Sequence, residues 1–309
     1  MFWFKNVMAY RLTKKIDFSH IEELLQEVKF IPCEKSDYSR FGWSEPLHDT
    51  GLLAYQASGH ILLVSCKEEK ILPAYAVNRK LSERLAELEE KEQRKLKKTE
   101  KLALKDAVIS EMLPHAFSKF THTAIWIDTN KGLVFVDSSS AKKSEDSLAL
   151  LRKSLGSLPV VPLAFNSDIS TVMTDWLSNN NAPEWATLLE DCKLKDFTAD
   201  NEITIKRQDL DNEEILNLIE HGNSVISLAI QRENHLSFVL NQDGTIGKIK
   251  FEDDITERND DILKEDYQQR FDADFILMVE ELSQLFELLA AEFDGIKQVA
   301  TATISAMLP

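Results

Sequence analysis

The stretch from Leu81 to Asp106 constrains the fold most, because it contains neither glycine nor proline and consists mainly of strong helix-forming residues. Wound at about 100° per residue, its leucines fall on one side and most of its basic residues on another. We call Leu81, Leu85, Leu88, Leu96 and Ala103 the apolar seam, and Lys91, Arg94, Lys98, Lys101 and Lys105, flanked by Lys95 and Lys97, the basic ridge. The pattern predicts one long helix that carries both.

The basic ridge has two interpretations. Cations at one-turn spacing suit a polyanion with regularly spaced phosphates. Alternatively, the stretch is a solvated helix with Glu–Lys pairs four residues apart, such as Glu87 with Lys91. Composition alone favours the solvated helix.

Charge is distributed unevenly along the 309 residues, whose net charge is −16. Residues 1–165 hold 25 Lys and Arg against 22 Asp and Glu, a net charge of +3. Residues 166–309 hold 11 against 30, a net charge of −19. The overall charge argues against nucleic acid as a ligand, but this asymmetry is typical of a polyanion-binding part beside an acidic part.

Periodicity and turn signals predict an α+β fold. The strongest hairpin signal joins residues 121–128 to 133–138 through a turn at 129–132. A helix over 144–155 should stop at Gly156. Residues 1–73 and 114–165 read as one α+β unit, which a helical excursion over 74–113 interrupts, and 166–309 as an acidic second part. Other expected elements include a loop over 34–47, helices over 185–192 and 264–293, and a three-stranded meander over 224–251.

Motifs for catalysis and metal binding are sparse. The chain has no P-loop, no dinucleotide fingerprint and no HExxH or GxSxG pattern, so we expect no cofactor. Seven scattered histidines and three isolated cysteines indicate neither a metal centre nor a disulfide framework. No apolar run approaches the length of a membrane span, and the N-terminus does not read as a signal peptide.

Two groups of acidic residues are candidate metal sites. Glu68 and Lys70 match the ExK half of a magnesium-dependent nuclease, with Asp49 upstream, but a salt bridge at a strand end is the simpler interpretation. The second group lacks the glycine and ligand spacing of a calcium loop and reads as a solvated acidic loop. It contains Asp253, Asp254, Asp260, Asp261, Glu265 and Asp266.

Several segments resemble the RdgC family of recombination-associated proteins. They are FKNVMAYRL at the start, KEEKILP (67–73), RKLKKTEK (94–101), AFSKF (116–120), IDTNKGLVFVD (127–137), AKKSEDSLALLRKSLGSLPVVPL (141–163) and QRFDADFILM (269–278). These matches span nearly the whole chain in order, whereas residues 166–250 and the tail after Gly295 match poorly. The long run ending in KSLGSLPVVPL is the most specific of them.

The resemblance implies a ring-shaped homodimer around double-stranded DNA. Family members bind DNA without sequence preference, are cytoplasmic and nucleoid-associated, and limit RecA-promoted strand exchange. The implied parts are a central antiparallel-sheet domain (1–73 and 114–165), an inserted helical tip (74–113) and an α+β base domain (166–309). The resemblance therefore also implies that the protein is not an enzyme.

Candidate interface residues follow from the ridge and the resemblance together. The expected DNA contacts are Lys91, Arg94, Lys95, Lys97, Lys98, Lys101, Lys105, Lys119, Lys142, Lys143, Arg152, Lys153, Lys206 and Arg207. The expected dimer or hinge positions are Leu81, Leu85, Leu88, Leu96, Phe117 and Phe120. The helix over 264–293 or the apolar tail would close the ring. A magnesium-dependent nuclease and a protein-interaction module with a basic helix remain the alternatives.

Overall fold

The computed structural model describes residues 3–263 and 266–298, which divide between two compact units. Unit 1 takes the described residues within Met1–Ser19, Tyr55–Leu62 and Ala124–Pro309, and unit 2 takes His20–Ala54 and Leu63–Thr123. Strands β3 (Ala54–Ala57), β4 (His60–Ile71) and β5 (Phe117–Asp128) contribute residues to both units. The class is α+β with antiparallel sheets, as the sequence predicts.

Unit 2 combines a short sheet segment with a pair of helices. Its other elements are α1 (Ile21–Gln26), β2 (Ser39–Ser44), α2 (Ala74–Glu92), α3 (Lys98–Met112) and a 3-10 turn at Leu113–His115. β2 pairs antiparallel with β4, from Ser39 opposite Glu69 to Ser44 opposite Val64. The loop expected over 34–47 is therefore partly wrong. Gly42 lets the segment 28–30 lie against β2, because a Cβ there would lie 2.7 Å from the backbone of Phe30.

Unit 1 holds most of the first sheet and all of the second. Its first-sheet strands are β1 (Met8–Leu12), β3 (Ala54–Ala57), β6 (Leu133–Val136) and β7 (Val160–Pro162). The order along the first sheet is β2-β4-β5-β6-β1-β7, with β3 beside β4. The hairpin of β5 and β6 lies where the turn signal predicts it. Helix α4 (Ala141–Leu155) ends as expected, with Gly156 in the left-handed conformation.

The second sheet runs β12-β11-β10-β8-β9, and all its pairs are antiparallel. Its strands are β8 (Thr187–Asp196), β9 (Asn201–Ile205), β10 (Asn223–Arg232), β11 (Leu236–Asn241) and β12 (Ile246–Phe251). The meander is confirmed. The helix expected over 185–192 is wrong, because residues 187–192 belong to β8, which pairs on both sides and buries Cys192 and Leu194.

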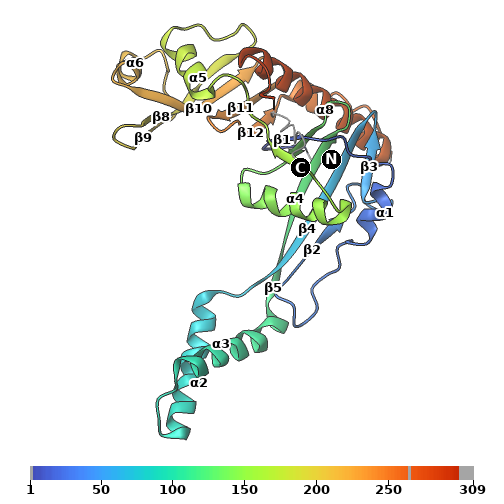
Figure 1. Cartoon of the computed structure of the whole chain (residues 1–309), viewed down its shortest axis with the longest axis vertical. Helices are drawn as coiled ribbons and strands as arrows, with labels where there is room; N and C mark the ends of the chain where they lie inside the picture. The colour runs from blue at the N-terminus through green and yellow to red at the C-terminus, as the bar shows by residue number, and fades with distance from the viewer. Residues whose placement is uncertain (1–2, 264–265, 299–309) are drawn as a thin grey trace, which may run out of the picture. The chain divides into compact units, whose positions relative to one another are not determined.

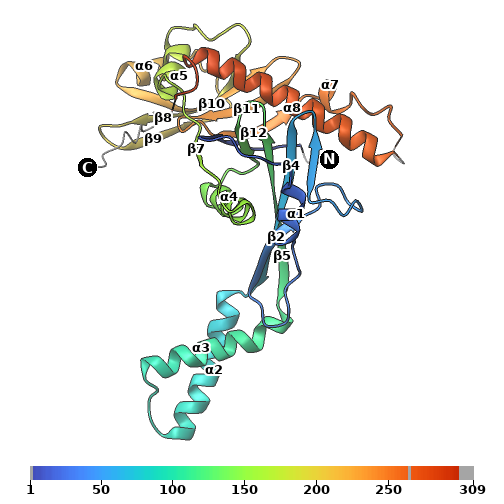
Figure 2. The same cartoon turned by 45° about the vertical axis from the view of Figure 1, so that its right-hand side comes forward.

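Helices cover the sheets of unit 1 and complete its core (Figures 1 and 2). They are α5 (Ile169–Ser178), α6 (Glu213–Glu220), α7 (Asp253–Thr256) and α8 (Tyr267–Glu292). α5 packs against β10, where the Ser170 hydroxyl donates to the Val225 carbonyl at 2.7 Å. Phe286 of α8 packs against Phe135 of β6, which stacks on Trp126 of β5. α8 confirms the expected long amphipathic helix over the part of 264–293 that is described.

None of the helices among the described residues combines the length and apolarity that crossing a membrane requires.

Candidate nucleic-acid interface

The expected single helix over 81–106 is wrong, because the chain forms a helical hairpin (Figures 1 and 2). α2 ends at Glu92, and Gln93 adopts the left-handed conformation with φ 52°. Leu96, in the turn, is 8% exposed, and Val77 of α2 and Val108 of α3 are buried. A continuous helix would leave the apolar residues of both halves in water, whereas folding back lets the two helices cover each other.

A carboxylate clamp holds the turn of this hairpin. Arg94 donates to both oxygens of Glu100, from Nη1 at 2.9 Å and from Nη2 at 2.7 Å. The backbone N–H of Lys97 donates to Glu100 Oε2 at 2.6 Å, which satisfies an amide at the start of α3. These bonds lower the pKa of Glu100 from its usual 4.5 to about 2, and those from Arg94 have the largest effect. Arg94 therefore has a structural role in the turn.

Replacing Glu100 by glutamine should loosen the turn at neutral pH and make no difference in strong acid. The folded-state pKa lies below the unfolded one, so the ionised carboxylate stabilises the hairpin above about pH 4.5, and this contribution disappears as pH falls through about 2. We expect the amide of Lys97 and those of the first turn of α3 to exchange with solvent faster in the variant at pH 7. Amide hydrogen exchange, followed against pH, measures this.

Glu90→Gln is the matched control, because Glu90 is an exposed carboxylate of α2 whose side chain forms no ion pair among the described residues. It should leave the exchange of Lys97 unchanged at every pH. An effect of Glu100→Gln that is equally large at pH 2 and pH 7 would contradict the clamp.

The basic ridge splits into paired and free cations. Arg94 binds Glu92 and Glu100, and Lys101 lies 3.7 Å from Glu89. The other basic candidates of unit 2 are exposed and form no ion pair with any described residue. They are Lys91, Lys95, Lys97, Lys98, Lys105 and Lys119. Lys98, Lys101 and Lys105 share one side of α3, with Lys98 and Lys105 about 10 Å apart along the axis.

The apolar candidates of unit 2 differ in how much surface they leave. Leu96 is buried, and Leu81, Leu85 and Leu88 are half-buried. Phe117 at the start of β5 is 84% exposed and Phe120 is 51% exposed, with its ring edge-on to that of Phe30. Tyr75 and Leu102, which sequence reasoning did not single out, are also exposed, at 77% and 55%. Leu102 directly precedes Ala103 of the apolar seam, which is the signal in the sequence that could have found it.

The basic candidates of unit 1 lie on two elements. Lys142, Lys143, Arg152 and Lys153 are exposed on α4, whose opposite side buries Leu148 and Leu151. Lys206 and Arg207 are exposed after the end of β9, and Arg207 has φ 53°. The Arg152 guanidinium also donates to the Leu158 carbonyl at 3.5 Å.

Glu68 has a structural environment. Only 3% exposed, it accepts hydrogen bonds from the Ser118 hydroxyl at 2.5 Å and the Cys33 N–H at 2.6 Å. These bonds hold the pKa of Glu68 below its usual range, and the one from Ser118 has the largest effect. Lys70 Nζ lies 3.8 Å from Glu68 and 3.0 Å from Ser118 Oγ. The hydrogen-bond donors Ser118 and Cys33 and the cation Lys70 together compensate the charge of the buried Glu68 carboxylate.

Metal-binding geometry is absent from the part of the chain that the structure describes: no group of three or more His, Cys, Asp or Glu is placed to hold an ion. Asp253 and Asp254 of the acidic loop form the start of α7. Glu265 and the tail from residue 299 lie outside the described residues.

Comparison with known proteins gives one consistent result. Residues 2–296 match the family model described as "RdgC: Putative exonuclease, RdgC". The chain is 54% identical to the recombination-associated protein RdgC of Actinobacillus pleuropneumoniae serotype 3, over 96% of this chain and 99% of the relative. The proteins of that name from Mannheimia succiniciproducens and Haemophilus influenzae are 54% and 52% identical, over the same shares of each chain.

Proposed function

This chain belongs to the RdgC family of recombination-associated proteins, and from that premise we propose that it binds double-stranded DNA without sequence preference. In this proposal it encircles the duplex as a ring-shaped homodimer and limits RecA-dependent recombination. It acts in the cytoplasm at the nucleoid, needs no cofactor and catalyses no reaction. Its parts are a central domain (1–73 and 114–165), a tip (74–113) and a base (166–309).

The observation that carries the proposal is the set of free lysines at the hairpin. Lys95, Lys98 and Lys105 are exposed and have no carboxylate partner among the described residues, although glutamates are abundant nearby. Free ammonium groups can displace the counterions of a phosphate backbone, and this contributes most of the affinity in sequence-independent binding. Such contacts position a duplex without reading base edges.

Further phosphate contacts are assigned to the other exposed cations. In unit 2 these are Lys91, Lys97 and Lys119; in unit 1 they are Lys142, Lys143, Arg152, Lys153, Lys206 and Arg207. Arg94 and Lys101 are engaged by glutamates, so we expect them to contribute less.

The proposed dimer contact uses the apolar surface that the hairpin leaves open. Leu81, Leu85 and Leu88 are only half-buried within one chain, and Phe117 and Phe120 are exposed. An exposed apolar surface beside charged residues is typical of a protein–protein interface, and a two-fold contact places the same patch on both copies. Leu96, the remaining expected dimer position, is buried within the hairpin.

Binding should depend steeply on salt and hardly on sequence. If about six phosphates are neutralised, log K should fall against log salt with a slope of about −5. Fluorescence anisotropy with labelled duplexes of equal length and unrelated sequence, at several salt concentrations, measures both properties. A flat salt response, or a strong preference among the duplexes, would rule out the electrostatic mechanism.

A magnesium-dependent exonuclease is the second candidate, favoured by the printed description of the family model. Glu68 and Lys70 would then carry the reaction, and Glu68→Gln should abolish magnesium-dependent shortening of linear duplex. Under our proposal the wild-type protein leaves the duplex intact with magnesium present. The bonds from Ser118 and Cys33 to Glu68 support the structural role over the catalytic one.

A protein-interaction module with a basic helix would bind an acidic protein and show no preference for nucleic acid.

A further inference from the structure

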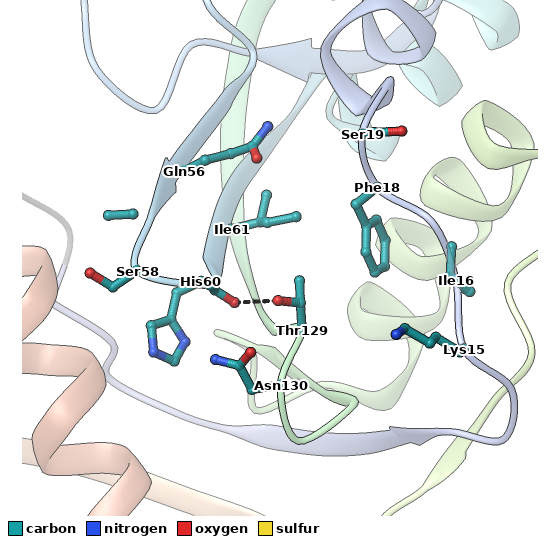
Figure 3. Close-up of a pocket in the computed structure, with 12 residues that line it drawn as sticks. Lys15, Ile16, Phe18, Ser19, Gln56, Ser58, His60, Ile61, Thr129 and Asn130 are labelled. Carbon is teal, nitrogen blue, oxygen red and sulfur yellow. Dashed lines mark hydrogen bonds between the residues drawn. The ribbon is translucent and has the colours of Figure 1, made fainter.

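Two adjoining cavities in unit 1 belong to neither the hairpin nor the other proposed DNA contacts. Figure 3 shows the first of them. Their volumes are about 460 and 450 Å³, within the range of small-ligand sites. Residues from the segment 13–19, which follows β1, and from the turn at 129–132 line both cavities, and the turn at 58–59 lines the first. The cavities share Lys15, Ile16, Phe18, Thr129 and Asn130.

The lining is positively charged, in a chain that holds 52 acidic residues. Lys14, Lys15 and Lys131 line the cavities, and none of the described lining residues is an Asp or a Glu. Lys131 is paired with Glu287 at 2.6 Å, whereas Lys14 and Lys15 are exposed and form no ion pair with any described residue. Two free ammonium groups at a cavity without carboxylates favour an anion.

Neutral hydrogen-bonding groups surround the first cavity. The side-chain amides of Gln56 and Asn130 have no hydrogen-bond partner among the described residues, and each offers both a donor and an acceptor. His60 Nδ1 accepts the Trp126 indole N–H at 3.1 Å, so the ring proton sits on Nε2, which is left as a donor. Burial lowers the pKa of His60, which keeps the ring neutral at pH 7.

The two turns are held together at this site. The Thr129 hydroxyl donates to the Gly59 carbonyl at 2.6 Å, the bond that is dashed in Figure 3, and the Thr129 N–H donates to the same oxygen at 3.1 Å. Gly59 has φ 83°, and a Cβ there would lie 2.5 Å from Asn130 Nδ2. Glycine at 59 therefore allows Asn130 to approach the His60 side of the cavity.

An apolar wall completes the first cavity. Ile16, Phe18 and Ile61 line it, and Phe18 and Ile61 are almost fully buried, so the wall is rigid. A lipid phosphate would need a deep apolar channel, whereas apolar residues form only one side here. An inorganic anion would leave the wall and the amides unused. A flat heterocycle with polar edges, joined to an anion, fits the whole lining.

We propose that these cavities bind a nucleoside 5′-phosphate, with the phosphate at Lys14 and Lys15 and the base between the apolar wall and the amides of Gln56 and Asn130. The nucleotide is either free or the 5′-terminal nucleotide of a DNA strand. The site uses none of the residues assigned to duplex binding, so it stands or falls independently of the proposed function.

The test is a titration of the full-length protein with AMP, followed by the indole N–H signal of Trp126 in NMR spectra, because Trp126 donates to His60. We expect saturation with a Kd of about 1 mM or tighter. Lys15→Ala and Asn130→Ala should each raise the Kd about tenfold, since each removes a phosphate or base contact. Both residues are exposed, so their replacement leaves the core unchanged.

Lys250→Ala is the control, an exposed lysine of β12 in unit 1 that lines neither cavity, and it should leave the Kd unchanged. Adenosine and inorganic phosphate should each bind at least about tenfold more weakly than AMP, because each makes half of the contacts. An oligonucleotide with a 5′-phosphate that competes with AMP identifies a strand end as the source, and one that does not compete identifies the free nucleotide. Absence of saturable AMP binding, equal binding of adenosine, or a Kd unaffected by both variants would overturn the proposal.

Discussion

Replacing Lys95, Lys98 and Lys105 together by glutamate should lower the affinity for duplex DNA by about a hundredfold or more at low salt. Each change removes a cation that has no partner within the described residues and adds a repelling anion. The side chains are exposed, so the helices should remain intact. Anisotropy titrations measure the affinity, and circular dichroism with thermal unfolding verifies the fold.

A charge-matched variant separates local from overall electrostatics. Lys35→Glu, Lys193→Glu and Lys250→Glu make the same change in net charge at three exposed lysines outside the hairpin, none with an ion-pair partner among the described residues. This variant should weaken binding far less. If the two triple variants lose affinity equally, binding reflects net charge alone and the hairpin is not the contact surface.

The second large effect is expected for crosslinked protein on circular DNA, and it depends on whether the protein encircles the duplex. After treatment with a bifunctional crosslinker, dimers bound to closed circular DNA should withstand a wash in about 1 M salt, where exposed charges are screened beyond about 3 Å. Cutting the circle should then release them. The physical reason is that a closed ring around a closed circle has no path of dissociation, however weak the electrostatic attraction becomes. The measurement is the amount of protein retained on circular and on linearised DNA.

The charge of the chain favours a ring. A chain of net charge −16 is repelled by DNA in most orientations, so its basic residues must face the duplex while its acidic surface faces away. A two-fold dimer achieves this by turning both basic surfaces inward. Protein bound to the same circular DNA but not crosslinked serves as the control, because rings that are not crosslinked can open and release the DNA. Equal release from circular and linear DNA after crosslinking would leave duplex binding intact and exclude encirclement.

Local signals in the sequence predicted the elements that depend on a few neighbouring residues. The β5–β6 hairpin was predicted because Thr129 to Gly132 form a turn between alternating strands, and Gly132 takes φ 65° there. The end of α4 was predicted because Gly156 can adopt the left-handed conformation at low cost. In both cases the residue that changes the chain direction is one whose backbone preference is visible in the sequence.

The helical hairpin could not be predicted in this way. Its turn contains no glycine or proline, and the left-handed position is occupied by Gln93, a good helix former. The chain reverses because the apolar residues of α2 and α3 bury one another and because Arg94 and Glu100 close the turn. β8 forms where the local pattern predicts a helix for a related reason, since its pairing with β9 and β10 overrides the local preference.

The sequence by itself determined the family, the α+β class and the presence of an excess of cations in one stretch, because these properties belong to residue identity and order. Only the tertiary structure decided which of those cations are available. Arg94 and Lys101 are bound by glutamates, while Lys95, Lys98 and Lys105 are free, and that difference depends on how the hairpin folds back. The cavity beside Lys15 likewise exists only because two distant turns meet at Gly59 and Thr129, a contact between residues 70 positions apart.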